Sequence, residues 1–368
     1  MNIRSVLHLP LIVASLGLMA GNYNENKQGQ DCTPLCYAGP VLDCDSNFDV
    51  YGGAIYEVVA TQGSEIAAQL DRIGTTFPAN GSIIQQTETP SWGFKVGLGY
   101  KNWIDNWRSY ARYTWFKAIS NLNYQASVGQ LYQPSSYANQ YVENLTLPQT
   151  FGFLNLQAGN YTLLNNLEVA IGRPTLVTES LELTTSYGVT ATWLTRRQIA
   201  FFTNNTAGTG ALTDLYALAG GGFFQNYQKY TWWGVGPMVN LRSVFYLGSG
   251  VGIYADTYIA LTYGASDVRT STFAKRNIGT VAAPNYNNVE AVLQNKMFQF
   301  SPEYNFQLGF NWSQTYKEDS IKASVMIGYE TTYFQQVMKT LINEIAYRNE
   351  NSAGLGIQGL VITAMLDF

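Results

Sequence analysis

The last nine residues of the chain, LVITAMLDF (360–368), alternate with a period of two. One set of positions is apolar throughout and consists of Leu360, Ile362, Ala364, Leu366 and Phe368. Strict alternation of this kind is typical of a β-strand with two different faces. The last residues of a domain are usually frayed and polar unless pairing holds them in place. The stretch therefore predicts a final strand that is paired along its whole length, up to an aromatic residue.

The composition favours strands that have lipid on one side and water on the other. Charged residues make up 12% of the 368 residues, about half of the usual share of roughly 25%. Aromatic residues reach 14%, yet the mean hydropathy is only −0.08. A helical membrane protein needs apolar runs of about 20 residues, and the sequence after residue 20 contains none. These features predict a transmembrane β-barrel, in which lipid-facing and water-facing residues alternate.

The same alternation appears in three longer segments, WGFKVGLGY (92–100), LELTTSYGVTATW (181–193) and SPEYNFQLGFNW (301–312). In each segment one face is mainly apolar and the other carries Gly, Thr, Asn, Gln or charged residues. A large soluble β-sandwich also alternates. However, soluble strands cluster near five or six residues, whereas these rows are longer, and they often begin and end in Trp or Tyr, as interface girdles do. We therefore expect an antiparallel up-and-down barrel.

Strand and connection lengths predict about ten barrel strands. They are expected near 48–60, 92–101, 107–117, 159–171, 181–193, 228–241, 251–263, 298–312, 320–331 and 355–368. Short and long connections alternate between them, as periplasmic turns and external loops do in outer-membrane barrels. The count rises to 12 or more if a long connection such as 118–158 hides a hairpin. Three windows in the long connections, 63–74, 286–297 and 334–348, look helical. Residues 360–368 are expected to close the barrel against 48–60, because lipid cannot satisfy an open sheet edge.

The beginning of the sequence resembles a secretory signal peptide. Arg4 precedes an apolar stretch over residues 9–19, and the small residues Ala20 and Gly21 follow, which predicts cleavage after about Ala20. A buried helix or a short anchor is the alternative. Removal of residues 1–20 leaves 20 basic and 25 acidic residues, a net charge of −5, and takes away His8, the single histidine. This charge does not favour nucleic acid as a partner.

The expected organisation is a signal peptide at 1–20, a periplasmic segment at 21–47 and a barrel at 48–368. The periplasmic segment contains Cys32, Cys36 and Cys44. With three thiols and no histidine, a metal site is not expected. In the oxidising periplasm, one disulfide within the chain and one odd thiol are the simplest arrangement. A set of thiols without a role is the alternative.

Three motifs, WGFKVGLGY (92–100), WRSYARYTWF (107–116) and LNNLEVAIGRP (164–174), resemble the Legionella-type major outer membrane protein family, pore-forming barrels that also occur in chlamydia-related bacteria. The sequence departs from the family pattern by placing Ala170 and Ile171 before Gly172-Arg173, and by having Asn166 where the family often has an acidic residue. The aromatic Phe368 also resembles the C-terminal assembly signal of bacterial outer-membrane proteins, here with Leu360, Ile362, Ala364, Leu366 and Phe368. The resemblance implies an outer-membrane porin. It also implies that the odd thiol links neighbouring chains, as in the disulfide-crosslinked envelopes of the family.

Charged residues on the water-facing rows are the candidate pore lining. They are Lys95, Arg108, Arg112, Glu168, Glu182 and Asp256. If the basic and acidic side chains lie on different walls of a wet lumen, they set an ion preference, and the net acidic charge favours cations weakly. If instead they pair with one another, they fill a narrow barrel. Diffusion of ions and small polar solutes needs no bound cofactor.

Other functions receive less support from the sequence. Barrel hydrolases use histidine as a general base or to activate water, and residues 21–368 contain none; an acid pair such as Glu168 and Glu182 is not singled out by its spacing. The GSGVG segment (248–252) continues into a strand and not into a helix, so bends explain its glycines better than a phosphate loop does. The long polar loops fit a surface adhesin, and a structural envelope barrel with a filled lumen, alone or as a homo-oligomer, is a further alternative.

Overall fold

The computed structural model describes residues 39–40, 47–61, 65–71, 81–85, 89–101, 107–125, 130–134, 153–203, 223–277, 285–316, 321–344 and 347–368. The barrel strands are β2 (Asn47–Thr61), β5 (Ser91–Lys101), β6 (Arg108–Gln125), β8 (Asn155–Thr178), β9 (Leu181–Thr203), β10 (Phe223–Gly248), β11 (Val251–Asn277), β12 (Tyr286–Tyr316), β13 (Ile321–Glu344) and β14 (Tyr347–Asp367). The four shorter strands are β1 (Gly39–Pro40), β3 (Glu65–Asp71), β4 (Gly81–Gln85) and β7 (Gln130–Pro134). In the described parts of the chain, no helix is long and apolar enough to cross a bilayer.

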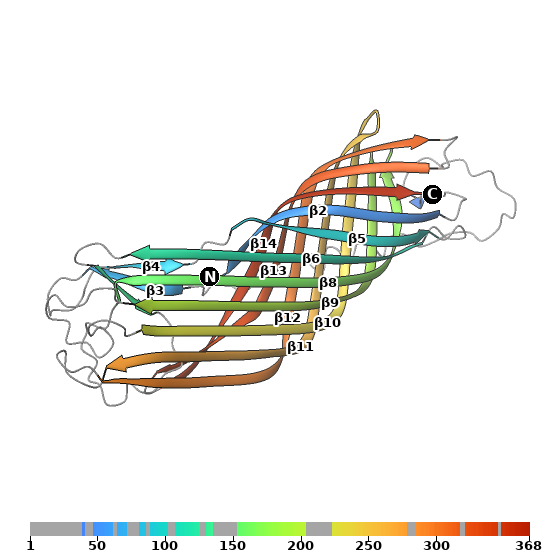
Figure 1. Cartoon of the computed structure of the whole chain (residues 1–368). Coiled ribbons are helices and arrows are strands. Elements are labelled where there is room, and N and C mark those ends of the chain that lie inside the picture. The colour runs from blue at the N-terminus through green and yellow to red at the C-terminus, as the bar shows by residue number, and fades with distance from the viewer. Residues whose placement is uncertain are drawn as a thin grey trace, which may run out of the picture.

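The long strands form a closed antiparallel ring (Figure 1). The eleven-stranded sheet runs in the order β1-β8-β6-β5-β2-β14-β13-β12-β11-β10-β9, and β9 also pairs with β8. Because β1 is only a two-residue ladder on β8, the ring consists of the other ten strands. All ten predicted strands are therefore present, and the prediction of a transmembrane up-and-down barrel is confirmed.

The final stretch of the sequence closes this ring. Strand β14 pairs with β2 so that Leu366 lies opposite Val50 and Ile362 lies opposite Ala54. Beyond the strand, the backbones of Phe368 and Phe48 exchange two hydrogen bonds of 2.9 Å. Residues 360–368 thus alternate because they belong to the strand that closes the ring. One row of their side chains faces outward, and the other row points into the barrel.

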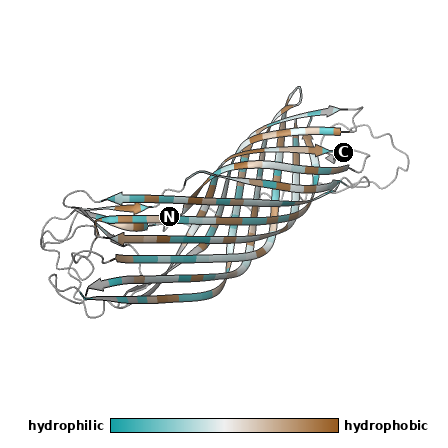
Figure 2. Cartoon of the chain, viewed as in Figure 1, coloured by the Kyte–Doolittle hydropathy of each residue, from teal (hydrophilic) through white to brown (hydrophobic). Residues whose placement is uncertain are grey.

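The outward rows are apolar and exposed, as a lipid-facing surface must be. Leu98 is 66% exposed, Phe310 64% and Phe368 56%, and hydrophobic and hydrophilic residues alternate along the strands (Figure 2). Two aromatic pairs mark the height of this surface on β2 and β5. The ring centroids of Phe48 and Tyr100 lie 5.0 Å apart and those of Tyr56 and Trp92 lie 4.8 Å apart, both in tilted geometry. Eight residues of strand separate the two levels, about 26 Å along the strand at the usual rise per residue, or about 20 Å of height at the usual strand tilt of a barrel.

Several strands continue far beyond the membrane on one side. Strands β10, β11 and β12 contain 26, 27 and 31 residues, whereas about 9–11 residues cross a bilayer. The short connections at Glu179–Ser180 and Ser249–Gly250, together with Asn47 and Phe368, lie at the opposite end, which is the periplasmic end by the usual rule. The prolonged strands therefore project outward from the external face.

The three predicted helical windows are wrong. Residues 286–297 belong to β12 and pair with β11 as far as Asn277 opposite Tyr286. Residues 334–348 belong to β13 and β14, and 63–74 contains β3. Their apolar spacing is compatible with a helix, but a neighbouring strand offers ladder hydrogen bonds along most of the described length of these windows, and tertiary pairing overrides local propensity.

A small second sheet, in the order β4-β3-β7, lies inside the external end. Its apolar side chains, Ile66, Ala67, Ile84 and Tyr132, pack with Phe153 and with the inner faces of β8, β9 and β10. The connection 118–158 therefore does not add a hairpin to the ring: β6 continues to Gln125, and β7 joins the small sheet.

Candidate functional site

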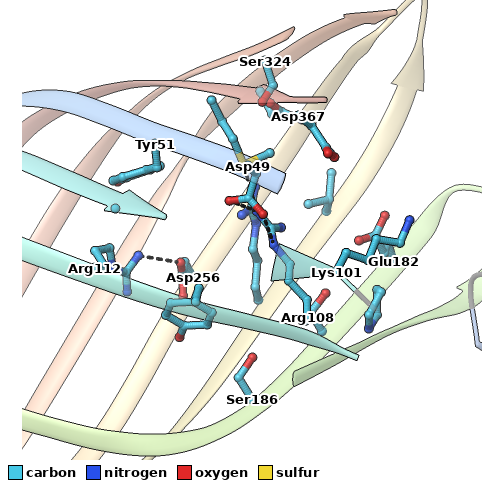
Figure 3. Close-up of a pocket in the computed structure, with 18 of the residues that line it drawn as sticks. Asp49, Tyr51, Lys101, Arg108, Arg112, Glu182, Ser186, Asp256, Ser324 and Asp367 are labelled. Carbon is cyan, nitrogen blue, oxygen red and sulfur yellow. Dashed lines mark hydrogen bonds and ion pairs between the residues drawn. The ribbon is translucent and has the colours of Figure 1, made fainter. Parts of the chain in front are cut away.

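The periplasmic end of the barrel contains a polar cavity of about 420 Å³, which we call the vestibule. It lies between the inner faces of the ring strands near their short turns (Figure 3). Its charged lining residues are Asp49, Lys101, Arg108, Arg112, Glu182, Arg242, Asp256, Lys322 and Asp367. These are five basic and four acidic side chains, so the vestibule is mixed in sign and close to neutral.

Two of the three vestibule arginines are held by carboxylates. Arg108 pairs with Asp49 at 2.8 Å. Arg112 pairs with Glu168 at 2.6 Å and with Asp256 at 3.5 Å, and the Arg112–Asp256 and Arg108–Asp49 contacts are visible in Figure 3. These pairs cross from one strand to another, so they cross-link the wall in addition to the ladder hydrogen bonds.

Above the vestibule lies a layer of buried charges. Lys95 pairs with Glu330 at 2.5 Å, and both side chains are almost fully buried. Asn305 also donates to Glu330, at 2.6 Å. Glu303 accepts hydrogen bonds from Thr192 and Thr262, at 3.1 and 3.2 Å. The carboxyl groups of this acidic layer are those of Glu57, Glu168, Glu303 and Glu330, all buried. Lys95 pairs with Glu330, and Arg112 pairs with Glu168.

An apolar layer follows toward the external end and packs the lumen across its width. Its members are Ile55, Val59, Phe116, Ala118, Leu164, Leu194, Tyr230, Trp232, Val268, Phe334, Val337, Leu355, Ile357 and Val361, each at most 5% exposed. They come from eight of the ten ring strands, so the layer spans the cross-section. Gly234 leaves room for the largest of them, because a Cβ at this position would meet the Trp232 indole at 2.5 Å.

A second polar layer lies beyond the apolar one. It contains buried residues such as Thr162, Arg196, Gln198, Thr270 and Thr272. The hydroxyls of Thr162 and Thr270 have no hydrogen-bond partner among the described protein atoms. Leaving such groups dry costs about 1–3 kcal/mol each, so hydration is the favourable state of this part of the lumen. Buried polar side chains therefore lie on both sides of the apolar layer, together with smaller apolar clusters.

All six predicted lining residues point into the barrel. Arg108, Arg112, Glu182 and Asp256 line the vestibule, while Lys95 and Glu168 are buried above it. Of the two arrangements that the sequence left open, separate walls or mutual pairing, the structure shows pairing, because Lys95, Arg108 and Arg112 are each paired with carboxylates. Their role as a pore lining stays a prediction.

Sequence reasoning missed several charged residues of this interior, among them Asp49, Glu57 and Arg242. Asp49 and Glu57 alternate with Phe48, Val50 and Tyr56 on the first strand, so the period of two could have placed them inside. Arg242 offered no such signal, because the predicted strand ended at residue 241, whereas β10 continues to Gly248.

Several predictions fall on residues that the structure does not describe. The signal peptide at 1–20 and the cysteines Cys32, Cys36 and Cys44 lie outside the described residues, so cleavage, disulfide pairing and cross-linking between chains stay predictions. Within the described ranges, no group of three or more His, Cys, Asp or Glu side chains is placed to hold a metal ion.

Comparison with known proteins identifies the family. The family model described as the Legionella pneumophila major outer membrane protein precursor matches residues 43–368. No curated protein matches the chain. Similar solved structures include the outer membrane protease OmpT from Escherichia coli (9% identity, TM-score 0.34, 88% of this chain and 96% of that chain). Others are a major outer membrane protein from Thermus thermophilus (11%, TM-score 0.28, 88% and 99%) and the Pseudomonas putida toluene transporter TodX (11%, TM-score 0.25, 88% and 89%). At these identities and TM-scores the three structures carry no argument about function.

Proposed function

Because this chain belongs to the Legionella major outer membrane protein family, we propose that it is a narrow porin for ions and small polar solutes that is closed at rest by the apolar layer. Solutes enter the vestibule, pass the acidic layer and cross the apolar layer when its side chains move apart. Hydrophobic constrictions gate in this way, by losing and regaining water. No step needs a cofactor, and the proposal assigns no catalysis.

The observation that carries the proposal is the sequence of layers along the lumen. A barrel filled only for stability would gain most from a continuous apolar core, since buried charges cost free energy unless they are paired and hydrogen-bonded. Here charged and polar side chains line the lumen on both sides of the apolar layer, and the other buried apolar clusters are smaller. The layer consists of side chains from the wall, so it can open by rotamer changes and without unfolding a strand.

The acidic layer supports a weak preference for cations. The net charge of the vestibule lining is close to zero, whereas the layer above it contains four carboxyl groups, of which Glu330 pairs with Lys95 and Glu168 pairs with Arg112. A ring of carboxylates lowers the free energy of a cation in the lumen relative to an anion. The preference therefore comes from the acidic layer and not from the charge of the whole chain.

Planar-bilayer recordings of the refolded protein across a KCl gradient test the proposal. We expect brief, infrequent steps with a reversal potential on the cation side. Replacing Glu168 with Gln should move the reversal potential toward zero, because it removes one carboxylate from the lumen and leaves Arg112 with Asp256 as its remaining ion-pair partner among the described residues. Glu290→Gln is the matched control, because Glu290 is exposed on the external part of β12 and its loss should leave the reversal potential unchanged.

A structural envelope barrel with a permanently filled lumen is the second candidate. The complete burial of Phe116, Phe334 and Leu355 favours it, since a packed layer of this kind stabilises the ring whether or not it ever opens. A silent membrane, with correct folding shown by heat-modifiable gel mobility, would support this candidate and contradict the porin.

A further inference from the structure

We propose that the vestibule contains a binding site for a small carboxylate or phosphate anion, built around Arg242. The site lies in the mouth of the proposed pore, so it deepens the proposed function, yet binding there does not require that the pore conducts. A ligand-binding role for this end of the barrel is independent of the apolar layer, which lies deeper in the lumen.

The third vestibule arginine differs from the other two in its partners. Arg108 and Arg112 face carboxylates at ion-pair distance, whereas Arg242 has no ion-pair partner among the described residues. One of its terminal nitrogens donates to the Sδ of Met326 at 3.2 Å, and a thioether is only a weak acceptor. A guanidinium carries five N–H donors, and its planar fork matches a carboxylate or a phosphate. Arg242 is therefore a cation with free binding capacity, half-buried in a cavity wall.

Two deeply buried polar side chains lie beside the Met326 contact. Asn311 lies opposite Met326 in the β12–β13 ladder, and Ser324 is two residues from Met326 on the same inner face. Ser324 is 3% exposed and Asn311 6% exposed, and both line the vestibule. Ser324 Oγ and Asn311 Oδ1 have no partner among the described protein atoms. The Ser324 hydroxyl can donate to an anionic oxygen, whereas Asn311 Oδ1 can only accept, from a protonated ligand oxygen or from water. A polar group left without a partner costs free energy, which a bound ligand would recover at Ser324.

The charges around the site favour an anion of low charge. Asp49 pairs with Arg108, and Asp256 and Glu168 pair with Arg112. Glu182 accepts a hydrogen bond from the Tyr246 hydroxyl at 2.8 Å, and Asp367 lies opposite Lys322 in the ladder. Arg242 is therefore the vestibule arginine that has no ion-pair partner among the described residues. A cavity of about 420 Å³ is in the size range of small-molecule sites.

Saturation-transfer NMR on the refolded protein in detergent, with succinate and with inorganic phosphate as probes, tests the site. We expect wild type to bind at least one probe. Arg242→Gln should weaken binding roughly tenfold or more, the effect of losing a charge-assisted interaction. Ser324→Ala should weaken it by a smaller factor; this hydroxyl has no hydrogen-bond partner among the described protein atoms, so its removal should leave the fold intact. Which probe binds distinguishes a carboxylate site from a phosphate site.

Arg197→Gln is the matched control, because Arg197 lies at the external end beside the Tyr161 ring. This variant should bind the probes as wild type does. The proposal is overturned if neither probe binds to wild type, or if Arg242→Gln and Ser324→Ala bind like wild type. The experiment contains no membrane and measures no current. Its failure would therefore leave the proposed pore standing, and a silent bilayer would leave the binding site standing.

Discussion

Lys95 and Glu330 show how single residues hold this barrel together. The two side chains come from β5 and β13 and meet at 2.5 Å inside the lumen, where neither has bulk water. Burying two charges costs free energy, and their mutual attraction offsets this cost only while both are present. The pair therefore acts as a cross-link across the lumen. Removing one partner costs more free energy than replacing both partners with uncharged side chains.

We predict that Lys95→Met alone destabilises the barrel by about 3–5 kcal/mol, because it leaves a buried carboxylate without its cation. The double variant Lys95→Met with Glu330→Gln should recover a large part of this loss. Unfolding in urea, followed by heat-modifiable mobility and circular dichroism, gives the four free energies of the cycle. If the losses of the single variants Lys95→Met and Glu330→Gln add up to the loss of the double variant, the pair contributes no coupling free energy.

At the residue scale, the sequence predicts which face a side chain takes but not which partner it meets. The period of two places Lys95 and Arg112 inside, because one residue of slip would turn the lipid face inward. The partner depends on the stagger between strands around the whole ring. Arg112 reaches Glu168 on the adjacent strand and Asp256 on β11, and no local pattern in the sequence contains the second contact.

At the scale of an element, the turn of the β10–β11 hairpin could be predicted from its glycines. Its turn passes through Gly248, Ser249 and Gly250, with φ values of 110°, 53° and 78°. Positive φ is readily available to glycine and strained for most other residues. The GSGVG segment is therefore a hairpin turn, in agreement with the interpretation of its glycines as bend residues.

We predict that Gly250→Ala destabilises the barrel by about 1–3 kcal/mol, the usual cost of a non-glycine residue forced into a strained conformation. A Cβ at Gly250 would also clash with the carbonyl oxygen of Ser313 on the neighbouring strand. Gly52→Ala is the control, because nothing lies within 4 Å of a Cβ at this position. Thermal unfolding midpoints in the same detergent compare the two, and similar midpoints would contradict the role of the turn.

The elements that sequence reasoning placed wrongly are those outside the membrane. Residues 286–297 have apolar residues at helical spacing, but they pair with β11 over the whole external hairpin. The membrane imposes strict alternation only where lipid contacts the strand. Beyond that height the pattern relaxes, so the sequence no longer indicates how far a strand continues.

For the molecule as a whole, the described structure is a β-barrel whose ring of ten strands is closed. Its lumen contains a vestibule, an acidic layer, an apolar layer and a second polar layer. The barrel itself could be predicted, because composition, alternation and closure by residues 360–368 all favour it. The apolar layer could not be predicted from the sequence, since its members come from eight strands and meet only after the ring closes. The central claim is that this layer, and not the vestibule, controls passage.

The most direct test compares two adjacent tryptophans of β10. Trp232 is 2% exposed inside the apolar layer, and Trp233 is 48% exposed on the lipid face. Each is replaced with Ala, and single-channel conductance in planar bilayers is measured beside wild type, with folding checked by heat-modifiable mobility. Trp232→Ala removes the largest side chain of the layer, so we predict a severalfold larger and steadier conductance, with Trp233→Ala unchanged from wild type. If both folded variants conduct as wild type does, the apolar layer is not the gate.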